Sequence, residues 1–261
     1  MTGYILKSLK LYPLFCYNHY MKFYHSKQLN SVPNVTHAFT TRDSGNLAFH
    51  VNDNSRHVEI NHEKLAKELS YKKETLVHMK QIHSVDVHLV TSEDSFEMPP
   101  TCDALITDKK NIPLMVMVAD CSALLFFEQD KNVIAVAHAG RAGAFGNIVK
   151  NVLESFQTHF ESRAENILVS IGASIHVCCY EVGAEIYKEA QKLGLENAIE
   201  IRENRYYLDV NTIIKSQLLA CGIQEEHIEI SKECTSCKRE RYFSYRAEKN
   251  TGRFAGVIML K

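Results

Sequence analysis

The stretch Ile112–Phe127, with the sequence IPLMVMVADCSALLFF, decides the fold. It is apolar on both faces of an extended chain, which is typical of strands buried between two layers. Asp120, Cys121 and Ser122 interrupt the apolar run. Polar side chains are costly to bury unless they are paired or functional. The stretch therefore predicts a buried strand region with a functional point inside it.

The chain on either side of this stretch predicts further strands and helices. A second buried strand is expected over Asn132–Ala137, ending at His138, and the turn AGRAGAFG then leads into an amphipathic helix over Asn147–Phe160. Because strands and helices interleave without a regular βαβ rhythm, the sequence favours a mixed α+β fold in one domain. The remaining expected strands are Val35–Thr41, Leu76–Val90, Ile167–Ile171, Ile228–Ser231 and Gly256–Leu260, and the remaining helices are Glu59–Leu69, Tyr180–Leu193 and Asn211–Cys221.

The composition excludes several classes of protein. The chain has 261 residues, of which 45% are hydrophobic, so it can bury a sizeable core. Its 30 basic and 31 acidic residues leave a net charge of -1, which gives no strong field for nucleic acid or an anionic membrane. No apolar run approaches the roughly 20 residues of a membrane helix. The spacing of the 8 cysteines is unlike that of a small secreted disulfide scaffold, which favours a reducing, cytoplasmic compartment.

The N-terminal residues are interpreted separately from the rest. Lys7 and Lys10 interrupt any apolar core of a signal peptide. Residues 1–30 are interpreted as an extension and residues 31–261 as a single domain. Met21 is a candidate native start, because MKFYHSKQLN leads directly into the domain.

Three residues with metal-binding side chains lie where the predicted buried strands end: His83, Cys121 and His138. One cysteine and two histidines form a plausible catalytic zinc set, in which the fourth position stays open for water. Zinc lowers the pKa of that water to about 7. The residues alone leave a second interpretation open, because a buried histidine can simply be hydrogen-bonded and a buried free cysteine is commonly inert.

Several short segments occur in a characteristic order. They are GNLAFHVNDN at 45–54, KQIHS at 80–84, CDALIT at 102–107, VADC at 118–121, AVAHAG at 135–140, CCYEVG at 178–183, and CTSC at 234–237 followed by YFSYR and TGRFAG. With these segments the chain resembles the YfiH/laccase-domain family from about Val35 to Lys261.

The resemblance implies a fold, an activity and a ligand set. The implied fold is a β-sandwich of mixed sheets flanked by helices, shared with a toxin deamidase, so that residues 31–261 would be one catalytic domain. The implied metal is zinc, with copper as the alternative, held by His83, Cys121 and His138. The implied activities are phosphorolysis of adenosine, inosine and S-methyl-5'-thioadenosine, and hydrolytic deamination of adenosine. The implied partners are a small nucleoside and phosphate, and the protein would be a monomer or homodimer.

The chain departs from the family pattern next to the third ligand. The family form HAGWRG would place Trp at 141 and Arg at 142, whereas this chain has Arg141 and Ala142 and no tryptophan at all. The arginine is therefore displaced by one position from its place in the family form.

Phosphate binding is expected at the turn after His138. A turn between a strand and a helix exposes backbone N–H groups to an anion. Arg141 and Arg42 are candidate bidentate donors to phosphate. The same turn is equally compatible with a plain connection that carries a solvated arginine.

Other polar residues are candidates for acid–base or substrate-binding roles. Asp120 adjoins a ligand and is a candidate catalytic acid–base group, although strand alternation can also point it away from the metal. Glu181 is a further candidate for that role. Gln81 lies at the even spacing that places it on the same strand face as His83, and His50 is a loop histidine expected to reach substrate.

The other cysteine pairs predict no site. Cys234 and Cys237 form a lone CxxC. A closed zinc site needs four ligands, and no second cysteine pair is expected nearby. Cys178 and Cys179 are adjacent and cannot easily bridge to each other. These four cysteines are interpreted as structural.

Three alternative functions stay open. Copper oxidation of phenols suits a His2Cys set, but the chain has no H-x-H pair. A metal-independent hydrolase acting on cell-wall precursors would use Cys121 as a nucleophile with His138 or His83 as its base. A binding protein that has kept the fold without the activity is the non-enzymatic alternative.

Overall fold

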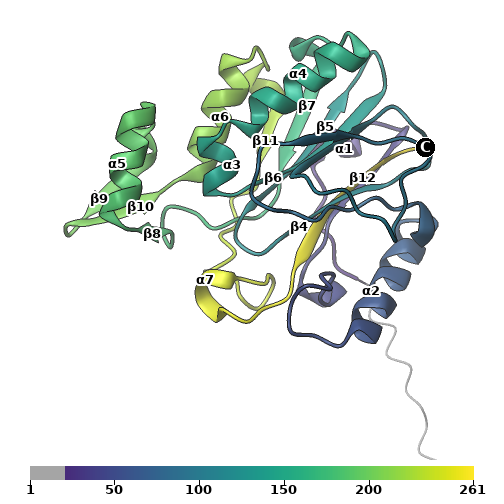
Figure 1. Cartoon of the computed structure of the whole chain (residues 1–261), viewed down its shortest axis with the longest axis horizontal. Coiled ribbons are helices and arrows are strands. Elements are labelled where there is room, and N and C mark those ends of the chain that lie inside the picture. Colours follow the sequence, from purple (N-terminus) through teal and green to yellow (C-terminus); the bar gives the residue numbers. More distant parts are fainter. Residues whose placement is uncertain (1–20) are drawn as a thin grey trace, which may run out of the picture.

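The computed structural model describes residues 21–261, which form a sandwich of two β-sheets flanked by helices (Figure 1). The smaller sheet has the order β1-β12-β4, with β1 at Val35–Phe39, β12 at Phe254–Leu260 and β4 at Leu114–Val118. Both of its pairings are antiparallel.

The larger sheet has six strands in the order β11-β7-β5-β6-β3-β2. Its β11–β7 and β2–β3 pairs are parallel and its other pairs are antiparallel. The sheet is therefore mixed, as the α+β prediction requires. The strands are β2 at Val87–Leu89, β3 at Ala104–Thr107, β5 at Ser122–Glu128, β6 at Val133–Ala139, β7 at Ile167–Ile171 and β11 at Ile228–Ile230.

Each central strand is buried on both faces because it lies between two layers. In β4, Val116 packs between the sheets, whereas Met115 packs under α2 at Ser55–Glu68. In β5, Leu125 packs between the sheets, whereas Phe126 faces the cluster that contains α4 and α6. The continuous apolar run is the sequence signal of this layering.

The flanking helices confirm the predicted architecture. Helix α4 at Ile148–Phe160 begins after Asn147, whose side chain accepts from the backbone N–H of Lys150, and α6 at Val210–Ala220 lies beside it. The predicted α+β sandwich with flanking helices is therefore confirmed. The short helices are α1 at Lys27–Asn30, α3 at Arg141–Phe145 and α7 at Tyr245–Glu248, and the 3-10 turns are Arg42–Ser44, Lys73–Thr75, Ala164–Asn166, Glu196–Ala198 and Glu225–His227.

A third sheet stands at one end of the body and was not expected (Figure 1). It has the order β8-β10-β9, with β8 at Glu181–Val182, β9 at Ile199–Arg202 and β10 at Arg205–Leu208. Helix α5 at Ala184–Leu193 packs on β10. The helix predicted from Tyr180 therefore begins later, because Glu181 and Val182 pair with β10 instead.

The strand predicted over Leu76–Val90 is wrong for most of its length. Only Val87–Leu89 is a strand, and Val77 and Lys80 form isolated bridges. His83 has a backbone φ of 61°, which breaks the extended conformation. His138 also lies within β6 and not after its end.

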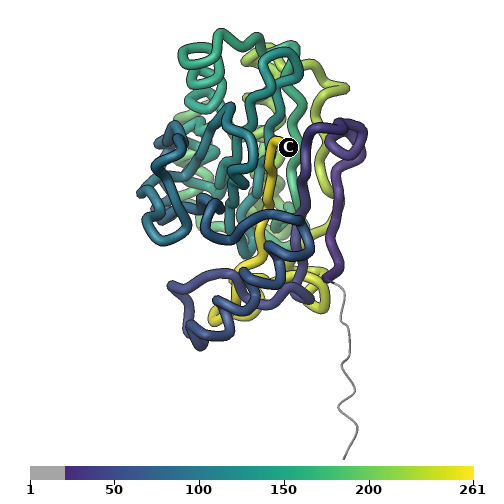
Figure 2. Tube along the Cα trace, turned by 90° about the vertical axis from the view of Figure 1, so that its right-hand side faces the viewer, coloured from purple at the N-terminus to yellow at the C-terminus, as the bar shows by residue number. Residues whose placement is uncertain are grey.

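Residues 21–30 belong to the packed part of the described chain. Tyr24 pairs with Phe39 of β1, and Leu29 of α1 is fully buried in the core between the sheets. Figure 2 shows this segment, in purple, running along the side of the body. Packing therefore already includes residues before the predicted boundary at 31. The proposed start at Met21 concerns residues 1–20, which lie outside the described residues.

In the part of the chain that the structure describes, no helix combines the length and the apolar character needed to cross a membrane.

Candidate functional site

The side chains of His83, Cys121 and His138 come together at one point. Their ligand atoms all lie within 4.8 Å of one another. His83 comes from the loop before β2, Cys121 from the turn between β4 and β5, and His138 from the end of β6. The imidazole rings of the two histidines meet edge to face, with centroids 4.8 Å apart. Three segments that are distant in the sequence thus supply two ring nitrogens and one sulfur to a shared point.

Asp103, which precedes β3, organises two of these three residues. Its Oδ1 lies 2.8 Å from His138 Nδ1, and the side chain is fully buried. The same carboxylate accepts from the backbone N–H groups of Ile82 and Ser84, at 3.1 and 2.7 Å, and from that of His83 at 3.1 Å. Because Nδ1 of His138 faces the carboxylate, Nε2 is the nitrogen left to face a ligand.

Asp103 also explains why the loop at 82–84 is not a strand. Its carboxylate takes the backbone hydrogen bonds that a neighbouring strand would otherwise accept. The sequence analysis missed this residue. The available signal was an acidic residue placed immediately before the buried segment ALIT at 104–107.

The charges of the group favour a thiolate. Burial alone would raise the pKa of the Cys121 thiol, but the adjacent His138 and His83 outweigh it and lower that pKa. Burial alone would also raise the pKa of Asp103, but the hydrogen bonds from His138 and from the backbone lower it to about 2. The imidazole of His138 therefore lies between two groups that favour the ionised form, the carboxylate of Asp103 and the thiol of Cys121.

Gly140 leaves room for the sulfur. Its backbone φ of -84° is ordinary for any residue, so its conformation does not require glycine. A Cβ at this position would lie 2.7 Å from Cys121 Sγ and 3.6 Å from His83 Cδ2. Glycine is thus required because the backbone approaches the cluster closely.

The cluster opens onto a cavity of about 610 Å³, within the usual range for small-molecule sites. Beside the three residues, its lining includes two tyrosines, Tyr180 and Tyr245. It also includes several cationic side chains that converge on the same space, namely Arg141, Arg246, Lys249 and Arg253. Of these, the sequence analysis singled out only Arg141. The other three belong to the C-terminal segment around YFSYR and TGRFAG, where charge alone does not distinguish them from surface residues.

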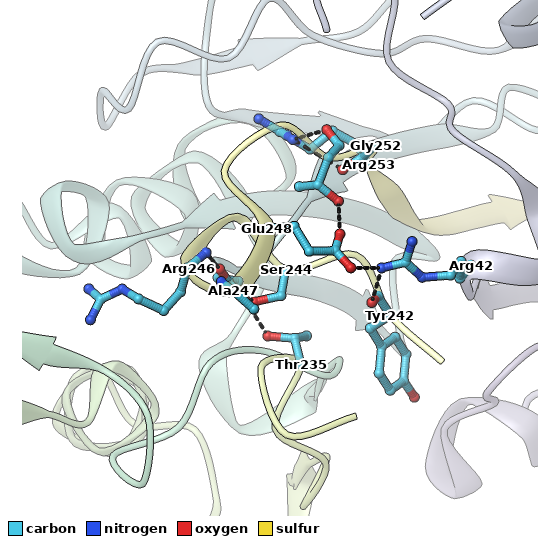
Figure 3. A network of polar contacts seen from close by, with 11 residues as sticks. Arg42, Thr235, Tyr242, Ser244, Arg246, Ala247, Glu248, Gly252 and Arg253 are labelled. Carbon is cyan, nitrogen blue, oxygen red and sulfur yellow. Dashed lines mark hydrogen bonds and ion pairs between the residues drawn. The ribbon is translucent and has the colours of Figure 1, made fainter. Parts of the chain in front are cut away.

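Asp120 lines this cavity but is held by the C-terminal segment. Its Oδ1 accepts from the Thr235 hydroxyl at 2.6 Å, and its Oδ2 accepts from the Arg246 backbone N–H at 2.6 Å. Its backbone φ of 90° is unusual for a residue other than glycine, and these contacts hold it there. Figure 3 shows the network around this segment. Both oxygens of Asp120 are thus engaged in positioning.

Gln81 and His50 also line the cavity. The Gln81 side chain pairs with the Met117 backbone, donating from Nε2 at 2.8 Å and accepting at Oε1 at 2.9 Å. It therefore extends the edge of β4, and the strand-face relation expected with His83 does not exist. Burial lowers the pKa of His50, followed by the effect of the Arg253 charge.

Arg42 does not line the cavity onto which the His83–Cys121–His138 cluster opens. Its guanidinium donates to Glu248 at 2.5 Å and to the Tyr242 carbonyl at 3.1 Å (Figure 3), and it lies over the Phe243 ring. It lines an adjacent hollow of about 510 Å³, which shares with the first cavity the residues His50, Tyr245, Lys249 and Arg253.

Arg141 lines the cavity, whereas Glu181 does not. Nη1 of Arg141 donates to Glu189 of α5 at 2.9 Å. Glu181 is exposed, and its carboxylate lies 3.6 Å from Arg205. The backbone carbonyl of Glu181 accepts a hydrogen bond from the Arg246 side chain at 2.7 Å, and this contact positions the arginine.

The donor set of the cluster fits a single divalent transition metal. The tautomer of His138 is fixed by Asp103, the thiol of Cys121 is biased toward the thiolate, and one side is open to the cavity. Three protein ligands and an open position are typical of catalytic zinc, and a His2Cys set also suits copper. The residues present thus fit either metal.

Fold and cluster together define a class: an α+β sandwich with two histidines and a cysteine gathered at one cavity. The chain belongs to the family described as multi-copper polyphenol oxidoreductase laccase, whose model matches residues 35–261. It is 32% identical over 225 residues to the purine nucleoside phosphorylase YlmD of Geobacillus stearothermophilus, covering 82% of each chain. It is also 32% identical over 222 residues to the purine nucleoside phosphorylase YfiH of Escherichia coli, covering 84% of this chain and 87% of that one.

Solved structures share the fold. The crystal structure of the YfiH protein of Bacillus licheniformis matches with a TM-score of 0.83 at 30% identity, covering 87% of this chain and 93% of that chain. The structure of YlmD from Geobacillus stearothermophilus matches with a TM-score of 0.81 at 29% identity, covering 88% and 93%.

Proposed function

We propose that this protein is a zinc-dependent purine nucleoside phosphorylase that accepts adenosine, inosine and S-methyl-5'-thioadenosine and also deaminates adenosine. The observation that carries the proposal is the His83–Cys121–His138 cluster opening onto a cavity of nucleoside size with a cationic lining. The names of the relatives give the reaction class.

The metal would be held by a ring nitrogen of His83, Sγ of Cys121 and Nε2 of His138. When bound, zinc supplies a Lewis acid and lowers the pKa of a coordinated water. Asp103 holds the His138 ring in its ligating orientation through the 2.8 Å contact. Asp120 holds the C-terminal segment against the cavity, so we assign it a positioning role in place of the acid–base role expected from the sequence.

The cavity lining offers separate groups for the two substrates. Phosphate carries negative charge, and Arg141, Lys249 and Arg253 in the cavity lining carry positive charge. A purine ring offers a flat face, and Tyr180 and Tyr245 offer aromatic rings in the same space. Holding phosphate and nucleoside side by side converts a bimolecular attack on the sugar carbon into an intramolecular one.

The test is product analysis with purified protein. Zinc-loaded protein is incubated with each nucleoside, with and without inorganic phosphate, and bases, sugar phosphates and inosine are separated by chromatography. We expect free base and a ribose phosphate only when phosphate is present, and inosine from adenosine without it. Cys121→Ser should abolish both. Absence of phosphate-dependent base release from all three nucleosides, with zinc bound, would overturn the proposal.

One observation favours a second candidate function. Asp103, His138 and Cys121 form a chain of orienting carboxylate, imidazole and thiol, which is the arrangement of a cysteine hydrolase. Such an enzyme would work without metal. Activity that survives EDTA and is lost to iodoacetamide would favour it over the phosphorylase.

The copper oxidase alternative has less support from the geometry. Within residues 21–261, the groups of three or more potential metal ligands are this cluster and a set of four cysteines. Neither group contains the several histidines that a multi-copper centre requires. Copper loading that produces phenol turnover would reverse this ranking.

A further inference from the structure

A second group of metal-binding side chains lies outside the cavity lining. Cys178 and Cys179 come from the turn between β7 and β8, and Cys234 and Cys237 come from the turn that follows β11. Their sulfur atoms all lie within 4.8 Å of one another. The sequence analysis treated Cys234 and Cys237 as a lone pair, and this is wrong, because the fold brings the adjacent pair at 178–179 beside them.

The sulfur separations match a shared ion better than covalent bonds. The separations are 3.4 Å for Cys179 to Cys237, 3.7 Å for Cys178 to Cys237 and 3.8 Å for Cys178 to Cys179. A disulfide needs about 2.05 Å between the sulfurs, and all four thiols are free. Four sulfurs placed tetrahedrally about 2.3 Å from a zinc ion lie about 3.8 Å apart.

The backbone holds the two turns together independently of any ion. Cys234 forms a bridge with Ser174, and the backbone N–H of Thr235 donates to the Ser174 carbonyl at 3.0 Å. The backbone N–H of His176 points at the Cys234 sulfur, 3.5 Å away. Such N–H groups stabilise negative charge on sulfur. The four sulfurs are therefore gathered by hydrogen bonds of the fold, which makes the group a preorganised site.

We propose that Cys178, Cys179, Cys234 and Cys237 bind a second divalent metal ion, zinc, in a closed site separate from the His83–Cys121–His138 cluster. Four thiolates select a soft or borderline ion and fill all four tetrahedral positions. No position is left for water or substrate, so this ion is structural. On binding, the four thiols release their protons to solvent.

The location of the four cysteines indicates what a bound ion would stabilise. Tyr180, which lines the cavity, directly follows Cys179 in the chain. Thr235, which lies between the other two ligands, donates to Asp120 beside Cys121. A zinc ion would thus join the segment that carries Tyr180 to the segment that holds Asp120, and both Tyr180 and Asp120 line the cavity. Cys178 and Cys237 are exposed, which leaves a path for the ion to enter.

The first test counts zinc ions in protein purified under reducing conditions, by elemental analysis. The unmodified chain should hold two per molecule, and Cys237→Ser and Cys121→Ser should each hold one. Cys221→Ser is the matched control, because this free cysteine belongs to neither group and should leave the count at two. In the Cys121→Ser background any remaining zinc reports on the four-cysteine site alone, whatever the fate of the proposed enzyme function.

The second test needs no substitution, so a variant that fails to fold cannot obscure the answer. Cadmium-113 replaces zinc in the unmodified protein, and its NMR spectrum should show two resonances, one of them in the strongly deshielded range of four-sulfur coordination.

A conservative substitution gives a further check. Cys178→His should retain the second metal, because histidine is also a zinc ligand.

Three results would overturn the proposal. The first is a zinc count that Cys237→Ser leaves unchanged. The second is a cadmium spectrum without a four-sulfur resonance. The third is a denatured, unreduced mass showing that Cys179 and Cys237 are joined by a disulfide.

Discussion

At the scale of the residue, the cluster depends on the carboxylate of Asp103. It accepts a hydrogen bond from His138 Nδ1 and fixes the loop that carries His83 through three backbone N–H groups. Two of the three proposed ligands are therefore oriented by one buried charge. A change that keeps its shape and removes that charge tests this role.

Asp103→Asn should weaken zinc binding at the cluster by about 10- to 100-fold, because the amide cannot accept at both ends as the carboxylate does. The measurement is a zinc competition titration, with circular dichroism to confirm folding. Asp86→Asn is the control, since this side chain is exposed on the same loop. An affinity equal to that of the unmodified chain would contradict the role.

Arg141 is the residue at which phosphate binding can be examined separately from nucleoside binding. It lines the cavity and is paired with Glu189 across its edge. Arg141→Ala should raise the KM for phosphate by at least about tenfold, as expected for a lost charge-assisted hydrogen bond, and change the KM for nucleoside less. Glu189→Gln, which keeps the arginine, is the matched variant. Equal effects of Arg141→Ala on both KM values would remove Arg141 from the phosphate site.

At the scale of the element, the sequence predicts what depends on periodicity and misses what depends on distant partners. The buried run at 112–127, the strand predicted over Asn132–Ala137 and the amphipathic helix over Asn147–Phe160 are found within two residues of their predicted places as β4 and β5, β6 and α4, because burial between layers leaves a local pattern. The strand predicted over 76–90 is wrong for most of its length, because the Asp103 carboxylate accepts the backbone hydrogen bonds of residues 82–84 in place of a neighbouring strand. The pairing of the two cysteine turns has no local signal either, since it follows from β11 lying beside β7.

For the candidate site, the sequence predicted the three cluster residues but not the contacts of the arginines around them. The motifs indicated His83, Cys121 and His138, and the fold brings them together. Arg42 was predicted as a donor to phosphate, and the structure pairs it with Glu248. The sequence did not indicate this ion pair, because it joins residues from opposite ends of the chain. Arg253 was missed for the converse reason, since only the fold shows that it lines the cavity.

Helix α2 contributes a pH-dependent part of the stability through His62. The ring is fully buried, stacks on Phe49 and contacts the Leu47 carbonyl at 2.8 Å. Burial lowers its pKa to about 4, with smaller effects of the Leu47 hydrogen bond and of the neighbouring His78, Glu59 and Lys73. Because the folded state holds this histidine neutral, its contribution is complete above pH 6.5 and is lost as the pH falls toward 4.

His62→Gln should therefore flatten the acid side of the stability curve. The amide can still donate to the Leu47 carbonyl but does not titrate. By pH 4.5 the unmodified protein should lose on the order of 2 kcal/mol more than the variant, measured by denaturant unfolding between pH 7.5 and 4.5. His57→Gln, at an exposed position of the same helix, should keep the original slope. Parallel curves for His62→Gln and the unmodified protein would contradict this account.

At the scale of the whole molecule, the site exists only when distant parts of the chain have met. The turn between β4 and β5, the end of β6 and the segment from Tyr245 to Arg253 all line one cavity. Metal binding is therefore linked to global folding, and each bound ion should add to the free energy of unfolding. Two ions of different roles would each stabilise the fold, one open to substrate at the cavity and one closed by four cysteines outside its lining.

The most direct test of the central claim is the anomalous scattering of zinc in crystals of the loaded protein, recorded on both sides of the zinc absorption edge. The account predicts a peak about 2.0–2.3 Å from a ring nitrogen of His83, Sγ of Cys121 and Nε2 of His138 together. Saturating zinc with no peak among these three side chains would contradict it.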